Sequence, residues 1–437
     1  MSLLLDLDRY HQNLGNLATV KSQGKVVQVI GLTIAAEGLK AQVGELCRIY
    51  ASGGRSCPAE VVGFREGRML LMPFAELAGI EPGSLVEASG CSLTVPAGEG
   101  VLGRVLDGLG RPIDGRGPLR GVRRYPISRA SPHPLSRSRI SQVLPTGVRA
   151  VDGLLTCGKG QRVGIFSASG VGKSTMLGMI ARGAASDINV IALIGERGRE
   201  VNEFIDRDLG PALERSVVIV STSDEPALVR IMGAWVATTI AEYFRDQNKD
   251  VVLLMDSVTR FAMAQREVGL AIGEPPAVKG YVPSVFALLP KLMERAGTSA
   301  RGTITAFYTV LVESDDLTEP VSDTVLSILD GHVILQRQLA AENHYPAIDI
   351  LSSISRVMAT IVERPHLEAA NRLRQVVATY RNARDLVDIG AYVKGSNPEI
   401  DYALKMMPEV NAFLRQAPDQ LSDLPQTLAK LKSMFAK

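Results

Sequence analysis

Ser167-Ala168-Ser169-Gly170-Val171-Gly172-Lys173-Ser174 is the stretch that decides the fold of the central part of the chain. These residues follow the Walker A pattern, with Ser167 in place of its first glycine, a position where a small residue suffices. A strand-like run at residues 162–166 precedes the stretch, and a helical pattern at residues 173–185 follows it. The order of strand, Gly-rich turn and helix predicts a loop that binds the phosphates of a nucleotide.

The predicted loop offers the groups that a nucleotide triphosphate and Mg²⁺ require. Its backbone N–H groups can surround the β-phosphate at the amino end of a helix. Lys173 is expected to reach the β- and γ-phosphates, and the Ser174 hydroxyl to ligate Mg²⁺. We therefore expect ATP as substrate, Mg²⁺ as cofactor, and a nucleotide-binding set that comprises Ser167, Ala168, Ser169, Gly170, Val171, Gly172, Lys173, Ser174 and Thr175.

Two carboxylates at the ends of apolar strands are expected at the same site. Asp256 ends the continuous apolar run at residues 251–255 and fits a Walker B carboxylate, which holds Mg²⁺ through a water. Glu196 ends the strand after the loop's helix, and from an adjacent strand tip it can orient a water at the γ-phosphate. The alternative for Glu196 is a surface ion pair with Arg197 or Arg199.

The fold class is predicted to be α/β, with a central P-loop (RecA-like) parallel sheet domain between a small β-barrel and a helical domain. Strand-like runs alternate with helical patterns in the middle of the chain, as a parallel sheet requires. Short β-rich runs at residues 26–30, 46–50, 59–64 and 69–72, separated by Gly-containing turns, favour a closed barrel. The expected domains are an amphipathic arm at 1–22, the barrel at 23–90, the ATPase domain at 91–360 and the helical domain at 361–437.

Composition excludes several classes of protein. Lys and Arg number 48 against 46 Asp and Glu, so no overall charge draws the chain to nucleic acid or anionic membrane, although a local patch stays open. No apolar run approaches the roughly 18 residues that span a bilayer. The four scattered cysteines, with no metal-ligand spacing, indicate reduced thiols in a cytoplasmic protein.

The first residues form a helical stripe. Spacings of four and three place apolar side chains on one face, namely Leu3, Leu7, Tyr10, Leu14 and Leu17. Two interpretations stay open: the helix packs on its own barrel, or it is an arm that docks on a partner.

Two motifs together resemble the catalytic-subunit family of rotary F- and V-type ATPases. They are GERGRE at residues 195–200 and PAIDILSSISR at residues 346–356. The resemblance implies a homohexameric ring with nucleotide at each subunit interface. It also implies that Glu196 is the catalytic carboxylate, that Arg356 is an arginine finger acting in the neighbour's site, and that Tyr345 stacks on adenine. Arg197 and Arg260 match further positions that line the site.

Within that family, the chain looks most similar to the flagellar type III export ATPases, chiefly through residues 388–401, DIGAYVKGSNPEID. A virulence-type (injectisome) export ATPase is the alternative, because it shares most of the core. A non-catalytic subunit is expected to lack the carboxylate at Glu196, and a proton-translocating rotary subunit is expected to carry an acidic stretch that the C-terminal part lacks. A ring-shaped nucleic-acid translocase is disfavoured by the balanced charge.

The flagellar resemblance also implies partners. Residues 275–281 are expected to face a central pore that holds a coiled-coil stalk protein, and the N-terminal arm is expected to bind a stator-like export regulator. Export-gate membrane proteins, export substrates and their chaperones complete the expected set, with no nucleic acid. The resulting location is cytoplasmic, at the inner face of the inner membrane and held there through partners.

A truncation distinguishes the two interpretations of the N-terminal stripe. If the stripe binds the regulator, deletion of residues 1–18 should abolish capture of that regulator in a pull-down, because its apolar face is the contact. Basal ATP hydrolysis serves as the control for folding. An unchanged complex would show that the stripe packs on the barrel instead.

Overall fold

The computed structural model describes residues 21–76, 78–312 and 317–436, so the predicted N-terminal arm lies almost wholly outside the described residues. The chain forms two compact units. One comprises Met1–Thr94 with Val268–Glu274, and the other comprises Val95–Glu267 with Pro275–Lys437.

The first unit contains a closed six-stranded barrel. Its strand order is β1-β2-β5-β4-β3-β6, and neighbouring strands in the sheet are antiparallel. Alternate side chains point inward and form a small apolar core that includes Val26, Ile34, Ile49, Val61 and Leu71. The strands are β1 (Gln23–Ile30), β2 (Thr33–Glu37), β3 (Glu45–Tyr50), β4 (Ser56–Arg65), β5 (Arg68–Pro73) and β6 (Leu85–Ser92).

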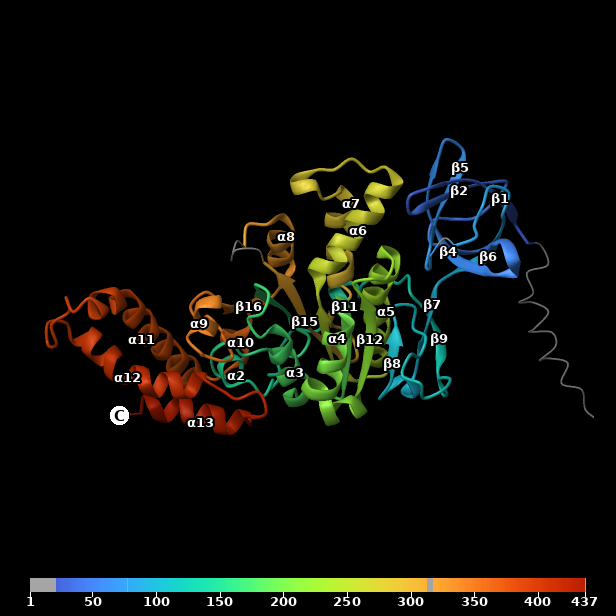
Figure 1. Ribbon diagram of the computed structural model, residues 1–437. Coiled ribbons are helices and arrows are strands. Elements are labelled where there is room, and N and C mark those ends of the chain that lie inside the picture. The colour runs from blue at the N-terminus through green and yellow to red at the C-terminus, as the bar shows by residue number, and fades with distance from the viewer. Residues whose placement is uncertain (1–20, 77, 313–316, 437) are drawn as a thin grey trace, which may run out of the picture. The chain divides into compact units, whose positions relative to one another are not determined.

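The second unit is built on a nine-stranded sheet with the order β17-β16-β10-β15-β13-β11-β12-β8, in which β14 pairs with β15 (Figure 1). All central pairs are parallel, and only β14 and β17 run antiparallel to their neighbours. The strands are β8 (Val105–Asp107), β10 (Arg162–Ser167), β11 (Ile188–Glu196), β12 (Ser216–Thr222), β13 (Asp250–Asp256), β14 (Gly297–Thr298), β15 (Thr303–Leu311), β16 (Gly331–Leu335) and β17 (Ile354–Ser355).

The central strands are apolar along their whole length because both faces of the sheet are covered. In β13, the side chains from Val251 to Met255 are at most 1% exposed. Each such burial contributes about 1.5–3 kcal/mol relative to exposure. Helices α3 (Lys173–Gly183), α4 (Gly198–Glu203) and α5 (Ala227–Asp246) pack against the strands of the sheet. Further α-helices between β8 and α11 are α2 (Arg149–Leu154), α6 (Val258–Ile272), α7 (Pro283–Met293), α8 (Pro320–Ile328), α9 (Arg337–Ala341) and α10 (Met358–Ile361).

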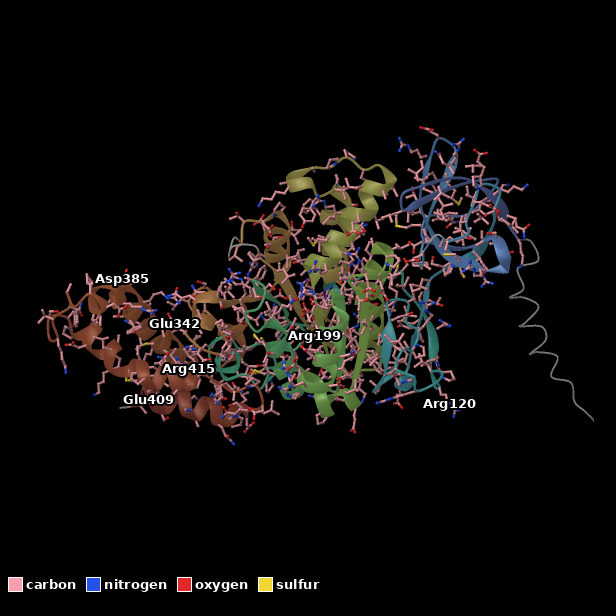
Figure 2. The ribbon with its side chains drawn as sticks, viewed as in Figure 1. Arg120, Arg199, Glu342, Asp385, Glu409 and Arg415 are labelled. Atoms are coloured by element: carbon pink, nitrogen blue, oxygen red, sulfur yellow. The ribbon has the colours of Figure 1, made fainter. Side chains whose placement is uncertain are left out.

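Three helices follow the sheet and belong to the same unit: α11 (Arg364–Asp388), α12 (Pro398–Leu414) and α13 (Leu424–Met434). Polar contacts attach α11 to the sheet domain, because Arg381 pairs with Asp349 at 2.8 Å and His366 Nε2 lies 2.8 Å from the carbonyl oxygen of Gly153. Figure 2 marks Asp385 and Glu409, two acidic side chains of this helical region.

The predicted fold class is confirmed: a small barrel, a central parallel sheet and C-terminal helices. The helical pattern expected at residues 173–185 corresponds to α3, and the expected helical domain at 361–437 contains α11, α12 and α13. Strands β2 and β6 and helix α13 were not anticipated. β2 is only five residues long, and β6 contains Gly90 and two serines. Such short or polar stretches carry little strand signal.

The sheet domain contains one fully buried ion pair. Arg295 donates from Nε to Glu242 Oε1 at 2.9 Å and from Nη2 to Oε2 at 2.5 Å, and the two side chains are 2% and 1% exposed. The Arg295 guanidinium lies 5.4 Å from the ring centre of Trp235, the only tryptophan in the chain.

Removing the charge of Glu242 should destabilise this domain. Glu242→Gln leaves the guanidinium buried without its counter-charge, for which a loss of about 3–5 kcal/mol in the free energy of unfolding is expected. The measurement is urea unfolding followed by the fluorescence of Trp235. Glu409→Gln, at an exposed position of α12, is the matched control and should change stability by less than about 0.5 kcal/mol. Equal effects of the two variants would contradict a stabilising role for the ion pair.

Candidate functional site

The Gly-rich loop has the geometry that its sequence predicts. It connects the end of β10 at Ser167 to the start of α3 at Lys173. Gly170 and Gly172 have φ angles of +81° and +95°, in the left-handed region that glycine adopts without strain. The loop borders a cavity of about 380 Å³ that also receives Gly195, Glu196 and Arg260. The turn therefore presents its backbone and the first turn of α3 to one enclosed space.

Lys173 lies between two carboxylates in this cavity. Its Nζ is 2.5 Å from Asp256 Oδ1 and 3.4 Å from Glu196 Oε1. Asp256, 2% exposed, also accepts a hydrogen bond from the Thr309 hydroxyl at 2.7 Å. The three charged groups form one compact cluster directly beneath the loop.

Burial and charge shift the pKa values in the cluster. Burial alone would lower the pKa of Lys173, but Asp256 and Glu196 outweigh it and hold that pKa above its ordinary value. Burial, with the charge of Asp256 and Glu200 nearby, raises the pKa of Glu196 to about 7, although Lys173 opposes the rise. Glu196 therefore changes protonation near neutral pH, which suits a group that handles the proton of a water.

The expectation that Glu196 lies on a strand next to that of the loop is wrong. Strands β15 and β13 lie between β10 and β11. Glu196 still reaches the cluster, because parallel strands bring their carboxyl ends to one edge and the Lys173 side chain extends along that edge. The alternative of a surface ion pair is also not seen, since Arg197 pairs with Glu200 at 3.6 Å and Arg199 with Glu203 at 3.0 Å (Arg199 is marked in Figure 2).

Arg260 and Arg197 both border the cavity but differ in environment. Arg260 packs against Gly195, where a Cβ atom would come within 2.9 Å of its side chain, and its Nε is buried without a hydrogen-bond partner among the described residues. Arg197, just before α4, is 83% exposed. Arg260 thus has an unused donor at the site, whereas Arg197 stands at its mouth.

A second cavity of about 320 Å³ lies on the other side of the loop, next to Tyr345. Val171, Gly172, Thr175 and Met179 form one wall, and Tyr345, 40% exposed, forms part of the opposite one. A largely apolar slot with an aromatic side chain is suited to a flat heterocyclic base. Among the predicted loop residues, Val171 borders this slot. Ser167 borders neither of the two cavities, because its side chain is buried under the loop and only 2% of Ser167 is exposed.

Arg356 does not line the site of its own chain. It follows β17, is exposed, and makes no ion pair within the described ranges; its backbone N–H donates to Asp330 O at 3.0 Å. This position agrees with a guanidinium that acts on another copy, since within its own chain it reaches neither cavity.

The oxygen donors at the site fit Mg²⁺, which prefers hydroxyl, carboxylate and phosphate oxygens. Ser174 borders the first cavity, and the buried Asp256 carboxylate lies within hydrogen-bond distance of Lys173 on the same side. These are the two residues that would hold the ion together with the nucleotide phosphates.

Gln416 and Glu200 are among the residues at the site that escaped sequence reasoning. Gln416, in the segment after α12, is 3% exposed and borders the slot; its backbone N–H donates to Tyr345 O at 2.9 Å. Its side chain bonds to Arg149 N at 2.8 Å and to Gly147 O at 2.8 Å. Glu200 borders the first cavity beside Glu196. A glutamine between helices carries no local signal, but Glu200 is part of the GERGRE motif and could have been found there.

Family comparisons cover most of the chain. Residues 147–355 match the nucleotide-binding domain of the ATP synthase alpha/beta family, and residues 26–90 match its beta-barrel domain. Residues 362–433 match the T3SS EscN ATPase C-terminal domain. The three matches correspond to the sheet, the barrel and the C-terminal helices.

Individual relatives are similar over nearly their full length. The chain is 54% identical to the flagellum-specific ATP synthase of Bacillus subtilis, covering 95% of both chains. It is 51% identical to the type 3 secretion system ATPase of Xanthomonas euvesicatoria, covering 97% of this chain and 96% of that one. The assembled ATPase EscN of the enteropathogenic E. coli type III secretion system superposes with a TM-score of 0.90 at 47% identity, over 94% of this chain and 99% of EscN. The chain belongs to the ATP synthase alpha/beta family, within the branch that holds the flagellum-specific and type III secretion ATPases.

Proposed function

We propose that this chain hydrolyses Mg-ATP in a homohexameric ring, and that hydrolysis assists the unfolding and export of flagellar proteins through a type III export apparatus. The observation that carries the hydrolytic part is the cluster of Lys173, Asp256 and Glu196 beneath a phosphate-binding loop. Export is supported by the relatives, which include flagellum-specific and secretion ATPases at 54% and 51% identity. Because these identities are so close, the ATPase of a virulence-type secretion system is the second candidate.

Each residue of the cluster has a task in phosphoryl transfer to water. The backbone of residues 168–173 holds the β-phosphate, and Lys173 moves from Asp256 toward the more strongly charged phosphate oxygens. Glu196 orients the attacking water and takes up its proton while the bond from the γ-phosphorus to the bridging oxygen breaks. Bound through Ser174 and Asp256, Mg²⁺ would supply positive charge at the phosphate oxygens.

Base binding and charge stabilisation come from the remaining predicted residues. Tyr345 is proposed to stack on adenine in the slot beside the loop, and Arg260 to use its unpartnered Nε toward the phosphates or toward Glu196. Arg197, at the mouth of the cavity, closes the site against a neighbouring copy. Arg356 of that neighbour is proposed to place its guanidinium at the γ-phosphate.

The ring and its central stalk are proposed from related structures. EscN has been determined as an assembled ATPase and in complex with its central stalk EscO, at TM-scores of 0.90 and 0.87. We propose an equivalent coiled-coil stalk for this chain, contacted by residues 275–281. Further proposed partners are a stator-like regulator at the N-terminal arm, export-gate membrane proteins, export substrates and chaperones.

The proposed location is the cytoplasm, at the inner membrane and held there through those partners. Among the described residues, none of the helices combines the length and the apolar character that crossing a bilayer demands. Attachment through partners therefore carries the membrane association in this proposal.

A shared active site can be tested by mixing two inactive variants. Arg356→Ala should lower kcat by about 10³-fold or more while ATP binding persists, because an arginine finger stabilises only the transition state. Lys173→Ala should lose hydrolysis at its own loop. Rings that contain both variants should recover part of the activity, because the Lys173→Ala subunit supplies its intact Arg356 to the intact loop of an Arg356→Ala subunit. The measurement is the rate of phosphate release from ATP.

Arg364→Ala, an exposed arginine on α11, is the matched control and should hydrolyse ATP normally. Mixed rings without any recovered activity would contradict the shared site.

The pH dependence tests the role of Glu196. The water-orienting carboxylate must be ionised, so kcat/KM should fall about tenfold per pH unit below its pKa of about 7. Glu200→Gln removes a nearby negative charge that raises this pKa, so the acidic limb of the profile should move to lower pH. Glu203→Gln, the control on the same helix, should leave the limb in place. A limb that is the same in both variants would assign it to another group, such as ATP itself.

A further inference from the structure

The positive charge of the chain is concentrated in one segment. Between Gly115 and Arg139 there are seven arginines and no acidic residue. Removing these seven from the total of 48 leaves 41 basic side chains against 46 acidic ones, so the rest of the chain is net negative. The near-neutral total therefore hides a strongly basic segment, which we call the arginine segment (residues 115–139).

Two of the seven arginines attach the segment to the sheet domain. Arg129 pairs with Asp246 at 2.9 Å and stacks 4.6 Å above the ring of Tyr125, whose hydroxyl donates to Asp246 at 2.6 Å. Arg137 donates to Ala296 O at 2.9 Å. These contacts fix the position of the segment, so its other arginines are held on a defined surface rather than on a loose loop.

A cavity of about 370 Å³, which we call the arginine pocket, opens beside the attached segment. Arg129, Ser136, Arg245, Asp246, Ser299 and Arg301 border it. The pocket lies where α5 ends and where β15 is about to begin, at the amino-terminal edge of the sheet. It is therefore at the edge opposite the nucleotide site, which stands at the carboxyl ends of the strands.

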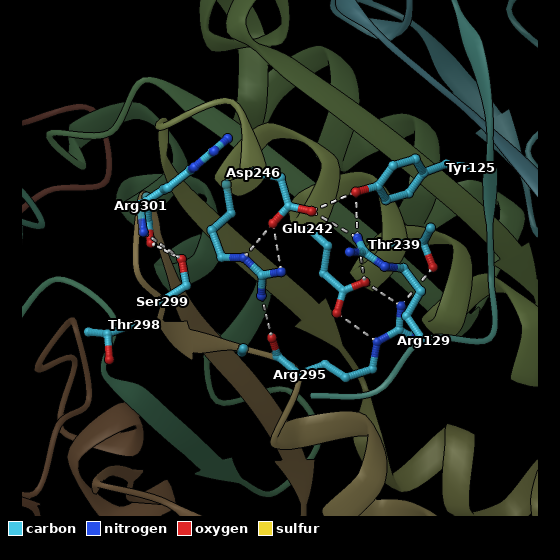
Figure 3. Close-up of polar contacts among 12 residues, drawn as sticks. Tyr125, Arg129, Thr239, Glu242, Asp246, Arg295, Thr298, Ser299 and Arg301 are labelled. Carbon is cyan, nitrogen blue, oxygen red and sulfur yellow. Dashed lines mark hydrogen bonds and ion pairs between the residues drawn. The ribbon is translucent and has the colours of Figure 1, made fainter. Parts of the chain in front are cut away.

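The charges around the pocket do not cancel. Three arginines border it, Arg129, Arg245 and Arg301, against the carboxylate of Asp246. Behind them the buried Arg295 pairs with Glu242 (Figure 3). The two carboxylates hold Arg129, Arg245 and Arg295 in place. Arg301 is exposed and pairs with no carboxylate in the described part of the chain. An anion that enters the pocket would thus meet an excess of positive charge.

The arginine segment also carries exposed arginines that do not border the pocket. Arg120 and Arg123 are exposed and likewise have no ion-pair partner among residues that the structure describes. β9 (Arg123–Pro126), which pairs with β7 (Thr94–Ala97), carries one of them on a regular strand. Neither arginine is needed to hold the fold, whereas Arg129 and Arg137 are.

We propose that the arginine pocket and the exposed arginines of the segment bind an acidic polypeptide segment of a partner, with one carboxylate in the pocket. The planar fork of an arginine matches a carboxylate through two parallel hydrogen bonds. Nucleic acid is a poorer fit, because none of the described residues that border the pocket is aromatic and the guanidinium of Arg129 already stacks on the ring of Tyr125. A membrane is also a poorer fit, since only Leu135 is a strongly exposed apolar side chain of the segment.

The test measures binding to the full chain by fluorescence anisotropy. The probe is a short labelled peptide of alternating Glu and Gly, with the Gln counterpart as the neutral comparison. The triple variant Arg120→Gln/Arg123→Gln/Arg301→Gln should weaken binding of the acidic peptide about tenfold, and raised salt should weaken it further. Basal ATP hydrolysis should stay unchanged, because the surface is remote from the loop; this also confirms folding.

The matched control replaces three exposed arginines elsewhere, Arg55→Gln/Arg337→Gln/Arg364→Gln, with the same change in net charge. Its affinity for the acidic peptide should stay within about twofold of the unmodified chain. Equal losses in the two triple variants would overturn the proposal, because binding would then follow net charge alone. The proposal would also be overturned if the neutral Gln peptide bound with the same affinity as the acidic Glu peptide. Phosphatidylglycerol vesicles or a single-stranded oligonucleotide that bound to this surface in place of the peptide would overturn it as well.

Discussion

The nucleotide site depends on one geometric constraint: the carboxyl ends of the parallel strands lie along a single edge. β10 delivers the loop, β13 delivers Asp256, and β11 delivers Glu196 to that edge. The ion pair of 2.5 Å between Lys173 and Asp256 joins the first two. Because the strands are buried and closely packed on both faces, a shift of one residue would move every side chain to the opposite face and disrupt its packing. The rigid sheet therefore sets the distances that the chemistry needs.

The chemistry-bearing residues could be predicted because their signals are local. The glycines around Lys173 predict the backbone conformation of the turn, because such a turn requires the left-handed φ angles that Gly170 and Gly172 adopt. Asp256 and Glu196 were found because each ends an apolar run. The same reasoning wrongly made the strand of Glu196 a direct neighbour of the loop's strand, because strand order is decided by long-range packing that no local pattern records.

Other parts of the site could not be read from the residues alone. Gln416 joins the base-binding slot from a segment far along the chain, and its role depends on hydrogen bonds to Gly147 and Tyr345 that exist only in the fold. The net charge of +2 left a local patch open but did not locate it, since it averages a basic segment with a remainder that is net negative. Summed composition describes the whole chain, whereas recognition depends on how charge is distributed over its surface.

The hydrogen bond between Gln416 N–H and the carbonyl of Tyr345 has a consequence for what the protein can sense. The loop that holds phosphates is anchored in β10 and α3, whereas the wall of the slot is anchored through Gln416 to the segment that joins α12 and α13. A ligand without a base, such as tripolyphosphate, would thus occupy the loop and leave the slot beside Tyr345 empty. In the proposed function a complete nucleotide would contact both, so binding of the base would be linked through Gln416 to the segment before α13.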